Sequence, residues 1–86
     1  MSNTRHILVT GGAGYIGSHT VVELIQQNYI PVIVDDFRNS EKRMLAGIES
    51  ITGVKPIIHE VDINNKEQFE AIFKKYSFGG IIHFAA

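Results

Sequence analysis

The segment Thr10-Gly11-Gly12-Ala13-Gly14-Tyr15-Ile16-Gly17 determines how this 86-residue chain is expected to fold. Its glycines have the spacing G-x-x-G-x-x-G when counted from Gly11, and G-x-G-x-x-G when counted from Gly12. The segment follows the apolar run Ile7-Leu8-Val9 and precedes a helical pattern. In that context the glycines allow a sharp turn off a strand, a close approach of the backbone to a pyrophosphate, and tight packing of the helix on the sheet. The segment therefore predicts a strand-to-helix turn that binds a dinucleotide.

The helix after this turn would present its first N–H groups, near Tyr15 and Ile16, to the phosphates. The positive end of the helix dipole adds roughly 0.3 to 1 kcal/mol per charge at an exposed site. The alternative is a glycine-rich turn that binds no ligand. The position of the motif between a strand and a helix favours the binding site.

Outward from the turn, short apolar runs alternate with segments of helical periodicity. A strand buried on both faces of a parallel sheet is apolar throughout, so such runs are interpreted as strands. Strands are expected at Ile7–Thr10, Pro31–Asp35, Pro56–Val61 and Ile81–Phe84. Helices are expected from Tyr15 to Asn28, from an N-cap at Ser40 to a C′ glycine at Gly53, and from an N-cap at Asn65 to a break at Gly79-Gly80.

Each helix is expected to bury one apolar face. In chain order, the side chains expected to face inward are Ile16, Val21, Leu24 and Ile25, then Met44, Leu45, Ile48 and Ile51, then Phe69, Ile72, Phe73 and Tyr76. Gln68 is a weak capping-box partner of Asn65. The aromatic stripe of the third helix is interpreted as core and not as a cofactor contact.

The order βαβαβαβ requires parallel strands joined by right-handed crossovers. We therefore expect an α/β fold: the amino-terminal part of a doubly wound (Rossmann) parallel sheet with strand order 3-2-1-4, with residues 1–86 forming a partial NAD-binding domain. The fourth strand would be interior in the whole fold, yet the chain ends two residues after Phe84. Because an uncovered apolar strand edge favours aggregation, the sequence is expected to be truncated after the fourth strand.

Composition excludes several classes of function. The 8 Lys and Arg against 9 Asp and Glu give a net charge of −1, which argues against a nucleic-acid partner. The absence of cysteine excludes disulfides, thiolate metal sites and a cysteine nucleophile. The 4 histidines have no metal-ligand spacing and are interpreted as packing or surface residues, so no metal is expected. No stretch is long and apolar enough for a signal peptide or a membrane span, so a cytoplasmic protein without a membrane partner is expected.

Asp35 lies eighteen residues after Gly17, at the carboxyl end of the second expected strand. An acidic residue there accepts hydrogen bonds from the adenosine ribose hydroxyls and repels a 2′-phosphate, which favours NAD over NADP. Asp36 adds negative charge beside it, whereas Arg38 points the other way because an arginine can neutralise a 2′-phosphate. The alternatives are a solvated strand-end carboxylate for Asp35 and a surface arginine for Arg38.

Asp62-Ile63 follows the third expected strand, at another carboxyl end of the sheet. Open α/β sheets bind ligands at this edge, so Asp62 is a candidate for the adenine amino group and Ile63 for the face of the ring. A role at the entry of the following helix, where Asp commonly accepts backbone N–H groups, explains the presence of Asp62 equally well.

Four segments carry a resemblance to a known family. They are Thr-Gly-Gly-Ala-Gly-Tyr-Ile-Gly-Ser-His-Thr at residues 10–20, Asp-Asp-Phe-Arg-Asn-Ser at 35–40, Val-Asp-Ile at 61–63 and Ile-His-Phe-Ala at 82–85. Together they resemble the amino-terminal part of the UDP-glucose 4-epimerase family, within the extended short-chain dehydrogenases/reductases. The glycine motif alone marks the superfamily, and the other segments narrow it to the epimerases.

The resemblance implies NAD as cofactor. In that family Tyr15 and Ile16 lie on the pyrophosphate, and Asp36, Asn39 and Ser40 join Asp35 on the adenosine ribose and its phosphate. Phe84, Ala85 and Ala86 run beneath the nicotinamide side of NAD. The expected cofactor-binding residues are Gly11, Gly14, Tyr15, Ile16, Gly17, Asp35, Asp36, Asn39, Ser40, Asp62, Ile63, Phe84, Ala85 and Ala86. The sequence departs from the family at Asp36, often Asn, and at Ala86, often Gly.

The resemblance also implies the reaction, the interconversion of UDP-galactose and UDP-glucose through a 4-keto intermediate, in a homodimeric parent enzyme of galactose metabolism. The family's proton acceptor is the Tyr of a Tyr-x-x-x-Lys pair. Tyr15, Tyr29 and Tyr76 are followed four residues later by His, Ile and Gly, so this chain contains no catalytic residue and is expected to be inactive alone. Another extended reductase acting on nucleotide sugars, such as a 4,6-dehydratase or a uronate epimerase, and a non-catalytic fragment remain as alternatives.

Overall fold

The structure, a computed structural model, describes residues 5–11, 15–37 and 43–84. In these residues four strands alternate with three helices. The elements are β1 (His6–Thr10), α1 (Tyr15–Gln26), β2 (Ile30–Asp35), α2 (Arg43–Thr52), β3 (Ile57–Glu60), α3 (Lys66–Lys75) and β4 (Phe78–His83).

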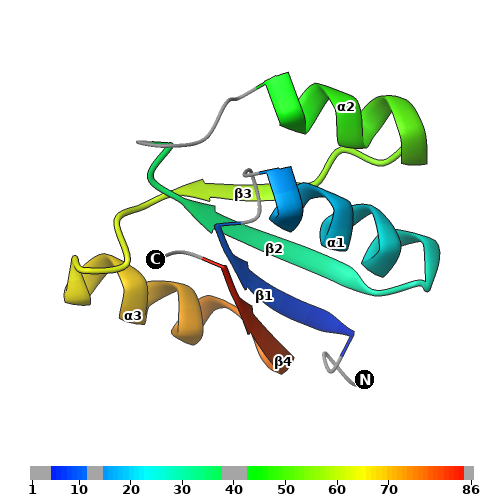
Figure 1. Cartoon of the computed structure of the whole chain (residues 1–86). Helices are drawn as coiled ribbons and strands as arrows, with labels where there is room; N and C mark the ends of the chain where they lie inside the picture. Colours follow the sequence, from blue (N-terminus) through cyan, green and yellow to red (C-terminus); the bar gives the residue numbers. More distant parts are fainter. Residues whose placement is uncertain (1–4, 12–14, 38–42, 85–86) are drawn as a thin grey trace.

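The strands form one parallel sheet in the order β3-β2-β1-β4, so the expected topology is confirmed. Helices α1 and α2 cover one face of this sheet and α3 covers the other (Figure 1). Each crossover returns the chain to the amino end of the sheet, and all carboxyl ends of the strands therefore lie along one edge.

Alternate residues of the central strands supply two apolar cores. Ile7 and Val9 of β1 and Ile33 of β2 pack under α1 and α2 together with Val21. The intervening Leu8 points to the other face and packs with residues of α3. Successive side chains of β1 point to opposite faces of the sheet, and helices cover both faces. Every residue in the middle of this inner strand is therefore apolar.

Three of the four α1 side chains expected to face inward pack in or against the core, and the fourth, Ile16, does not. Gly17, Ser18 and Val21 are buried, whereas Ile16 is 66% exposed. Gly17 and Ser18 let the helix approach the sheet closely, and this places Ile16 outward in the first turn. Ile51, at the end of α2, was also expected inside and is likewise 66% exposed.

Strand β4 is longer than expected, because it begins at Phe78 rather than at Ile81. Gly79-Gly80, interpreted as a break after the third helix, lie within the strand, where Gly80 pairs with Ile7 of β1. A Cβ built on Gly80 would lie 3.4 Å from Ile7 Cδ1, a contact with the end of a flexible side chain. Helix α3 ends earlier instead, with Tyr76 as an extended C-cap residue.

The expected caps are confirmed where the structure describes them. Asn65 Oδ1 accepts a hydrogen bond from the backbone N–H of Gln68 at 3.2 Å, the N-cap of α3. Gly53 follows α2 with φ of 73° and donates its N–H to Glu49 O at 2.8 Å. The N-cap expected at Ser40 lies outside the described residues.

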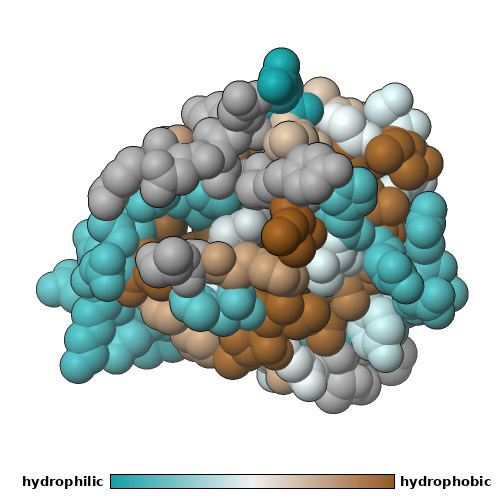
Figure 2. All heavy atoms as spheres, viewed as in Figure 1, coloured by the Kyte–Doolittle hydropathy of each residue, from teal (hydrophilic) through white to brown (hydrophobic). Residues whose placement is uncertain are grey.

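Apolar side chains remain accessible around β4, the edge strand. Ile81 is 58% exposed and Phe84, just beyond the strand, is 38% exposed. Figure 2 shows apolar atoms gathered at the lower centre of the molecule, where Figure 1 places β4, and hydrophilic atoms at the lower left, where α3 lies. Among the described residues, no helix has the length and hydropathy needed to cross a membrane.

Candidate dinucleotide-binding site

The glycine turn leaves β1 at the edge where the strands end. Gly11 has φ of 76°, in the left-handed region that favours glycine, and its N–H donates to Val34 O of β2 at 2.8 Å. This bond places the start of the turn beside the end of β2, one residue before Asp35. Gly14, together with the rest of 12–14, lies outside the described residues.

The first turn of α1 lies at the same edge. The helix begins at Tyr15 and has no acidic side chain in its first turn, so no carboxylate of that turn repels an anion there. The exposed Ile16 side chain stands at this end of the helix, and Gly17 is buried. The positive end of the α1 dipole therefore lies at the carboxyl edge of the sheet, where it would favour binding of an anion.

Asp35 closes β2 in a buried position. The residue is 7% exposed, and its Oδ1 accepts the backbone N–H of Phe37 at 2.8 Å. Phe37 has φ of 59°, so this bond stabilises a turn that leads the chain off the strand. Asp36, next to it, is half-buried. The other residues expected on the ribose, Asn39 and Ser40, lie outside the described residues, as does Arg38.

Asp62 lies at the exit from β3 and organises the entry to α3. Its Oδ1 accepts the N–H of Asn64 at 2.9 Å and its carbonyl accepts that of Asn65 at 2.8 Å. These bonds are the helix-entry chemistry that the sequence left open for this residue. Ile63 is half-buried and packs against the core of Leu8 and Val34.

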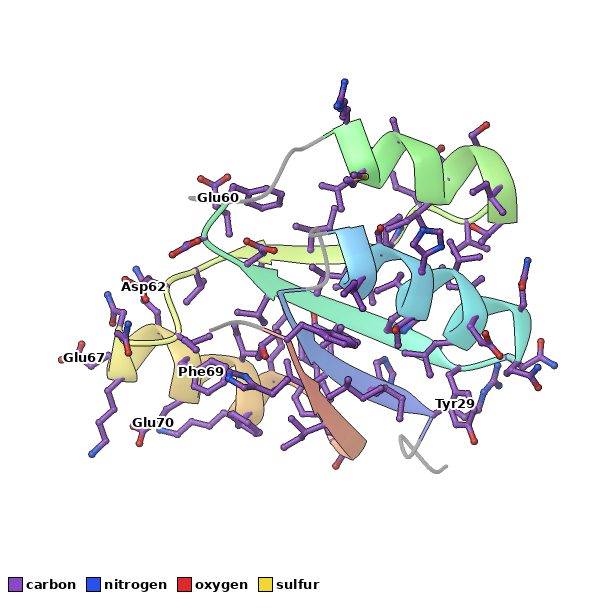
Figure 3. All side chains as sticks on the ribbon, viewed as in Figure 1. Tyr29, Glu60, Asp62, Glu67, Phe69 and Glu70 are labelled. Atoms are coloured by element: carbon purple, nitrogen blue, oxygen red, sulfur yellow. The ribbon has the colours of Figure 1, made fainter. Side chains whose placement is uncertain are left out.

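The labelled side chains in Figure 3 mark the two ends of the sheet. Glu60 and Asp62 lie at the carboxyl end of the strands, and Tyr29 lies at the opposite end. The N–H of Val61 donates to Asp35 O at 3.2 Å, which continues the pairing of β2 and β3 beyond the strands. The exits of β1, β2 and β3 therefore form one continuous edge.

The exit from β4 completes this edge. Phe84 donates its N–H to Thr10 O at 2.8 Å, and His83 Nδ1 lies 2.5 Å from Thr10 Oγ1. Sequence reasoning missed this pair, because Thr10 was interpreted as the last residue of a strand and His83 as one of four packing or surface histidines. Ala85 and Ala86 lie outside the described residues.

His59 lies on the face of β3 covered by α3. Its Nε2 is 2.9 Å from Tyr76 Oη. Burial and, to a smaller extent, the Lys75 ammonium lower the pKa of His59 below its ordinary value of 6.5. In the part of the chain that the structure describes, no three His, Asp or Glu side chains are grouped so as to hold a metal ion.

The fold and its carboxyl edge place the chain in the Rossmann class of α/β proteins. The family model for GDP-mannose 4,6 dehydratase matches residues 8–86. The chain belongs to this family, which agrees with its resemblance to the extended short-chain dehydrogenases/reductases.

The relatives in sequence carry epimerase names. The UDP-glucose 4-epimerase of Dictyostelium discoideum is 52% identical over 79 residues, covering 92% of this chain and 23% of the relative. The human UDP-glucose 4-epimerase is 45% identical over 85 residues, covering 92% of this chain and 24% of the relative. The chain therefore spans about a quarter of the length of these relatives.

A solved structure gives the same result. The UDP-glucose 4-epimerase from Bifidobacterium longum, in complex with NAD+ and UDP, superposes with a TM-score of 0.90 at 36% identity, over 94% of this chain and 24% of that chain. The resemblance to the amino-terminal part of UDP-glucose 4-epimerases is confirmed.

Proposed function

We propose that this chain is the NAD-binding part of a UDP-glucose 4-epimerase, which interconverts UDP-galactose and UDP-glucose through a 4-keto intermediate. The main structural support is the bond from Gly11 N–H to Val34 O, because it brings the glycine turn and the Asp35 carboxylate to one edge. The identity of 52% to a protein named UDP-glucose 4-epimerase supports the choice of reaction.

The described residues fit a dinucleotide chemically. The first turn of α1 directs its backbone N–H groups toward the carboxyl edge, where a pyrophosphate would bind, and the Asp35 carboxylate is the candidate partner of the ribose hydroxyls. The negative charges of Asp35 and Asp36 disfavour the extra phosphate of NADP. When bound, NAD supplies a hydride acceptor for the sugar C4–H.

Several further assignments belong to the same proposal. Tyr15 and Gly17 join Ile16 near the pyrophosphate, Asn39 and Ser40 join Asp35 and Asp36 at the ribose, and Asp62 and Ile63 frame the adenine. The wall beneath the nicotinamide consists of Phe84, Ala85 and Ala86. The parent protein would be a cytoplasmic homodimer of galactose metabolism that binds a UDP-sugar through residues outside this chain.

A 4,6-dehydratase acting on a nucleotide sugar is the second candidate. The name of the matching family model favours it, since that model covers residues 8–86. The two candidates share the NAD-binding edge, so the nucleotide test below applies to both.

Calorimetric titration of the 86-residue chain with NAD and with NADP tests the proposal. We expect saturable binding of NAD and binding of NADP that is at least about tenfold weaker, because each unfavourable interaction of about 1.4 kcal/mol costs a factor of ten. Absence of heat at millimolar NAD, or tighter binding of NADP, would contradict it.

A further inference from the structure

Thr10 joins β1 to both neighbouring strands at the carboxyl edge. Thr10 is 1% exposed, and its backbone carbonyl accepts a hydrogen bond from the N–H of Phe84 at 2.8 Å. Its side-chain Oγ1 lies 2.5 Å from Nδ1 of His83, its register partner on β4. The next residue, Gly11, donates to Val34 O of β2. A line of hydrogen bonds thus crosses from β2 through β1 to β4 immediately below the glycine turn.

The chemistry of the pair fixes the state of the imidazole. A buried hydroxyl proton needs an acceptor, and His83 Nδ1 is the acceptor that the described residues provide for Thr10. With the Thr10 hydroxyl as donor, Nδ1 accepts and the neutral ring carries its proton on Nε2, which is the tautomer that this pairing requires. The hydroxyl restricts an otherwise exposed imidazole to one orientation.

Phe84 follows His83 directly and is tied to Thr10 through its own N–H. The side-chain bond and the backbone bond act on consecutive residues of the β4 exit, so together they hold this exit at a fixed distance from Gly11. A backbone bond alone leaves the last residue of an edge strand free to fray, because β4 has a described neighbour on one side, β1.

We propose that Thr10 and His83 are a positioning pair, in which the hydroxyl-to-imidazole bond holds the β4 exit against the glycine turn and so favours binding of the nicotinamide half of NAD. The inference rests on the proposed function for its ligand, and on the hydrogen bonds above for the pair itself. Neither residue is assigned to the reacting atoms.

The first experiment needs no ligand. Nitrogen-15 NMR of the histidine rings at about pH 8, where imidazoles are neutral, should show the Nε2–H tautomer for His83. Thr10→Val removes the hydroxyl at constant shape and should abolish this preference and speed hydrogen exchange of the Phe84 amide. Thr10→Ser keeps the hydroxyl and should restore both. An Nδ1–H tautomer, or Phe84 exchange that is the same in all three proteins, would overturn the pair.

The second experiment measures binding of NAD and of ADP, which lacks the nicotinamide half. Thr10→Val and His83→Leu should each weaken NAD binding about fivefold to tenfold, as expected for one lost hydrogen bond, and leave ADP binding unchanged. Thr10→Ser keeps the hydroxyl donor, and His83→Asn keeps an acceptor atom at the δ position. Both variants should bind NAD as the unmodified chain does. Thermal unfolding of each variant establishes that it is folded at the titration temperature.

The outcomes separate the two proposals. If the unmodified chain binds neither nucleotide, the proposed function fails, and the NMR result still decides whether the pair exists. If it binds NAD and Thr10→Val binds equally well, or loses NAD and ADP binding equally, the positioning role is wrong while the proposed function stands.

Discussion

Asp35 combines two tasks in one buried side chain. Its Oδ1 stabilises the turn at Phe37. In the proposed function, its charge is also the feature that would favour NAD over NADP. Substitution by asparagine can distinguish the two tasks. Its amide oxygen can still accept a hydrogen bond from the Phe37 N–H, but it carries no charge. A test of nucleotide selectivity can therefore be made without removing the turn.

We expect Asp35→Asn to fold like the unmodified chain, to bind NAD about tenfold more weakly, and to discriminate less against NADP. The loss follows from replacing a charge-assisted hydrogen bond by a neutral one, a difference of about 1 kcal/mol or more. Titration with both nucleotides measures it. Asp35→Ala serves as the comparison, since it should also lower the melting temperature through the Phe37 turn. Unchanged selectivity in Asp35→Asn would argue against ribose recognition by this residue.

His59 makes stability depend on pH. Because its pKa is lowered in the folded state, the unfolded chain binds the proton more tightly. The stability from this residue is therefore complete above the ordinary pKa of 6.5 and is lost as the pH falls from there toward the lower folded-state value.

Urea unfolding between about pH 8 and pH 5 tests this dependence. The unmodified chain should lose stability below about pH 6.5, and His59→Gln should lose less over the same range. Lys75→Gln should fall between them, because burial is the larger cause and Lys75 the smaller one. Identical slopes for the unmodified chain and His59→Gln would contradict the assignment.

At the scale of elements, the two glycines of the α2 region form a matched pair. A Cβ built on Gly47, inside the helix, or on Gly53, after it, meets no atom within 4 Å. They differ in backbone conformation, since Gly53 has φ of 73°. Substitution by alanine therefore reports local backbone effects, without a clash between the new Cβ and residues elsewhere in the fold.

Gly53→Ala should destabilise the chain by about 1 kcal/mol, the cost of the left-handed conformation for a residue with a Cβ. Gly47→Ala should stabilise it by about 0.5 to 1 kcal/mol through helix propensity. Denaturant unfolding measures both changes against the unmodified chain. Equal effects of the two substitutions would mean that Gly53 does not terminate α2 as the structure describes.

The elements themselves were largely predictable, because each strand and helix has its own hydrophobic period. The errors came from tertiary contacts. Gly79-Gly80 have the local preferences of a break, yet pairing of Gly80 with Ile7 incorporates them into β4. Ile16 is apolar, yet the close approach of Gly17 to the sheet turns it outward. Neither contact has a periodic signal in the sequence.

For the whole molecule, connectivity predicted the strand order β3-β2-β1-β4, because right-handed crossovers leave few arrangements. The positions of Gly11 after β1 and of Asp35 at the end of β2 were predictable from the sequence pattern. The Thr10–His83 pair was not, since its members are 73 residues apart and meet through the register of β1 and β4. The helix-entry hydrogen bonds of Asp62 are likewise not revealed by spacing.

The chain should have no epimerase activity by itself. It contains no Tyr followed four residues later by Lys, and a proton acceptor must lie within hydrogen-bonding reach of the sugar hydroxyl. A coupled assay of UDP-galactose conversion, with NAD present and a full-length epimerase as positive control, measures this. Turnover by the purified chain above the buffer blank would show that other groups can carry the proton.

The most direct test of the whole account is amide NMR of the labelled chain with and without NAD. We expect the largest shift changes at the carboxyl edge, at Gly11, Ile16, Asp35 and Phe84, and none at Tyr29 or Val54, which share a cavity at the other end of the sheet. Changes centred on Tyr29 and Val54, or a spectrum unaffected by millimolar NAD, would contradict the account.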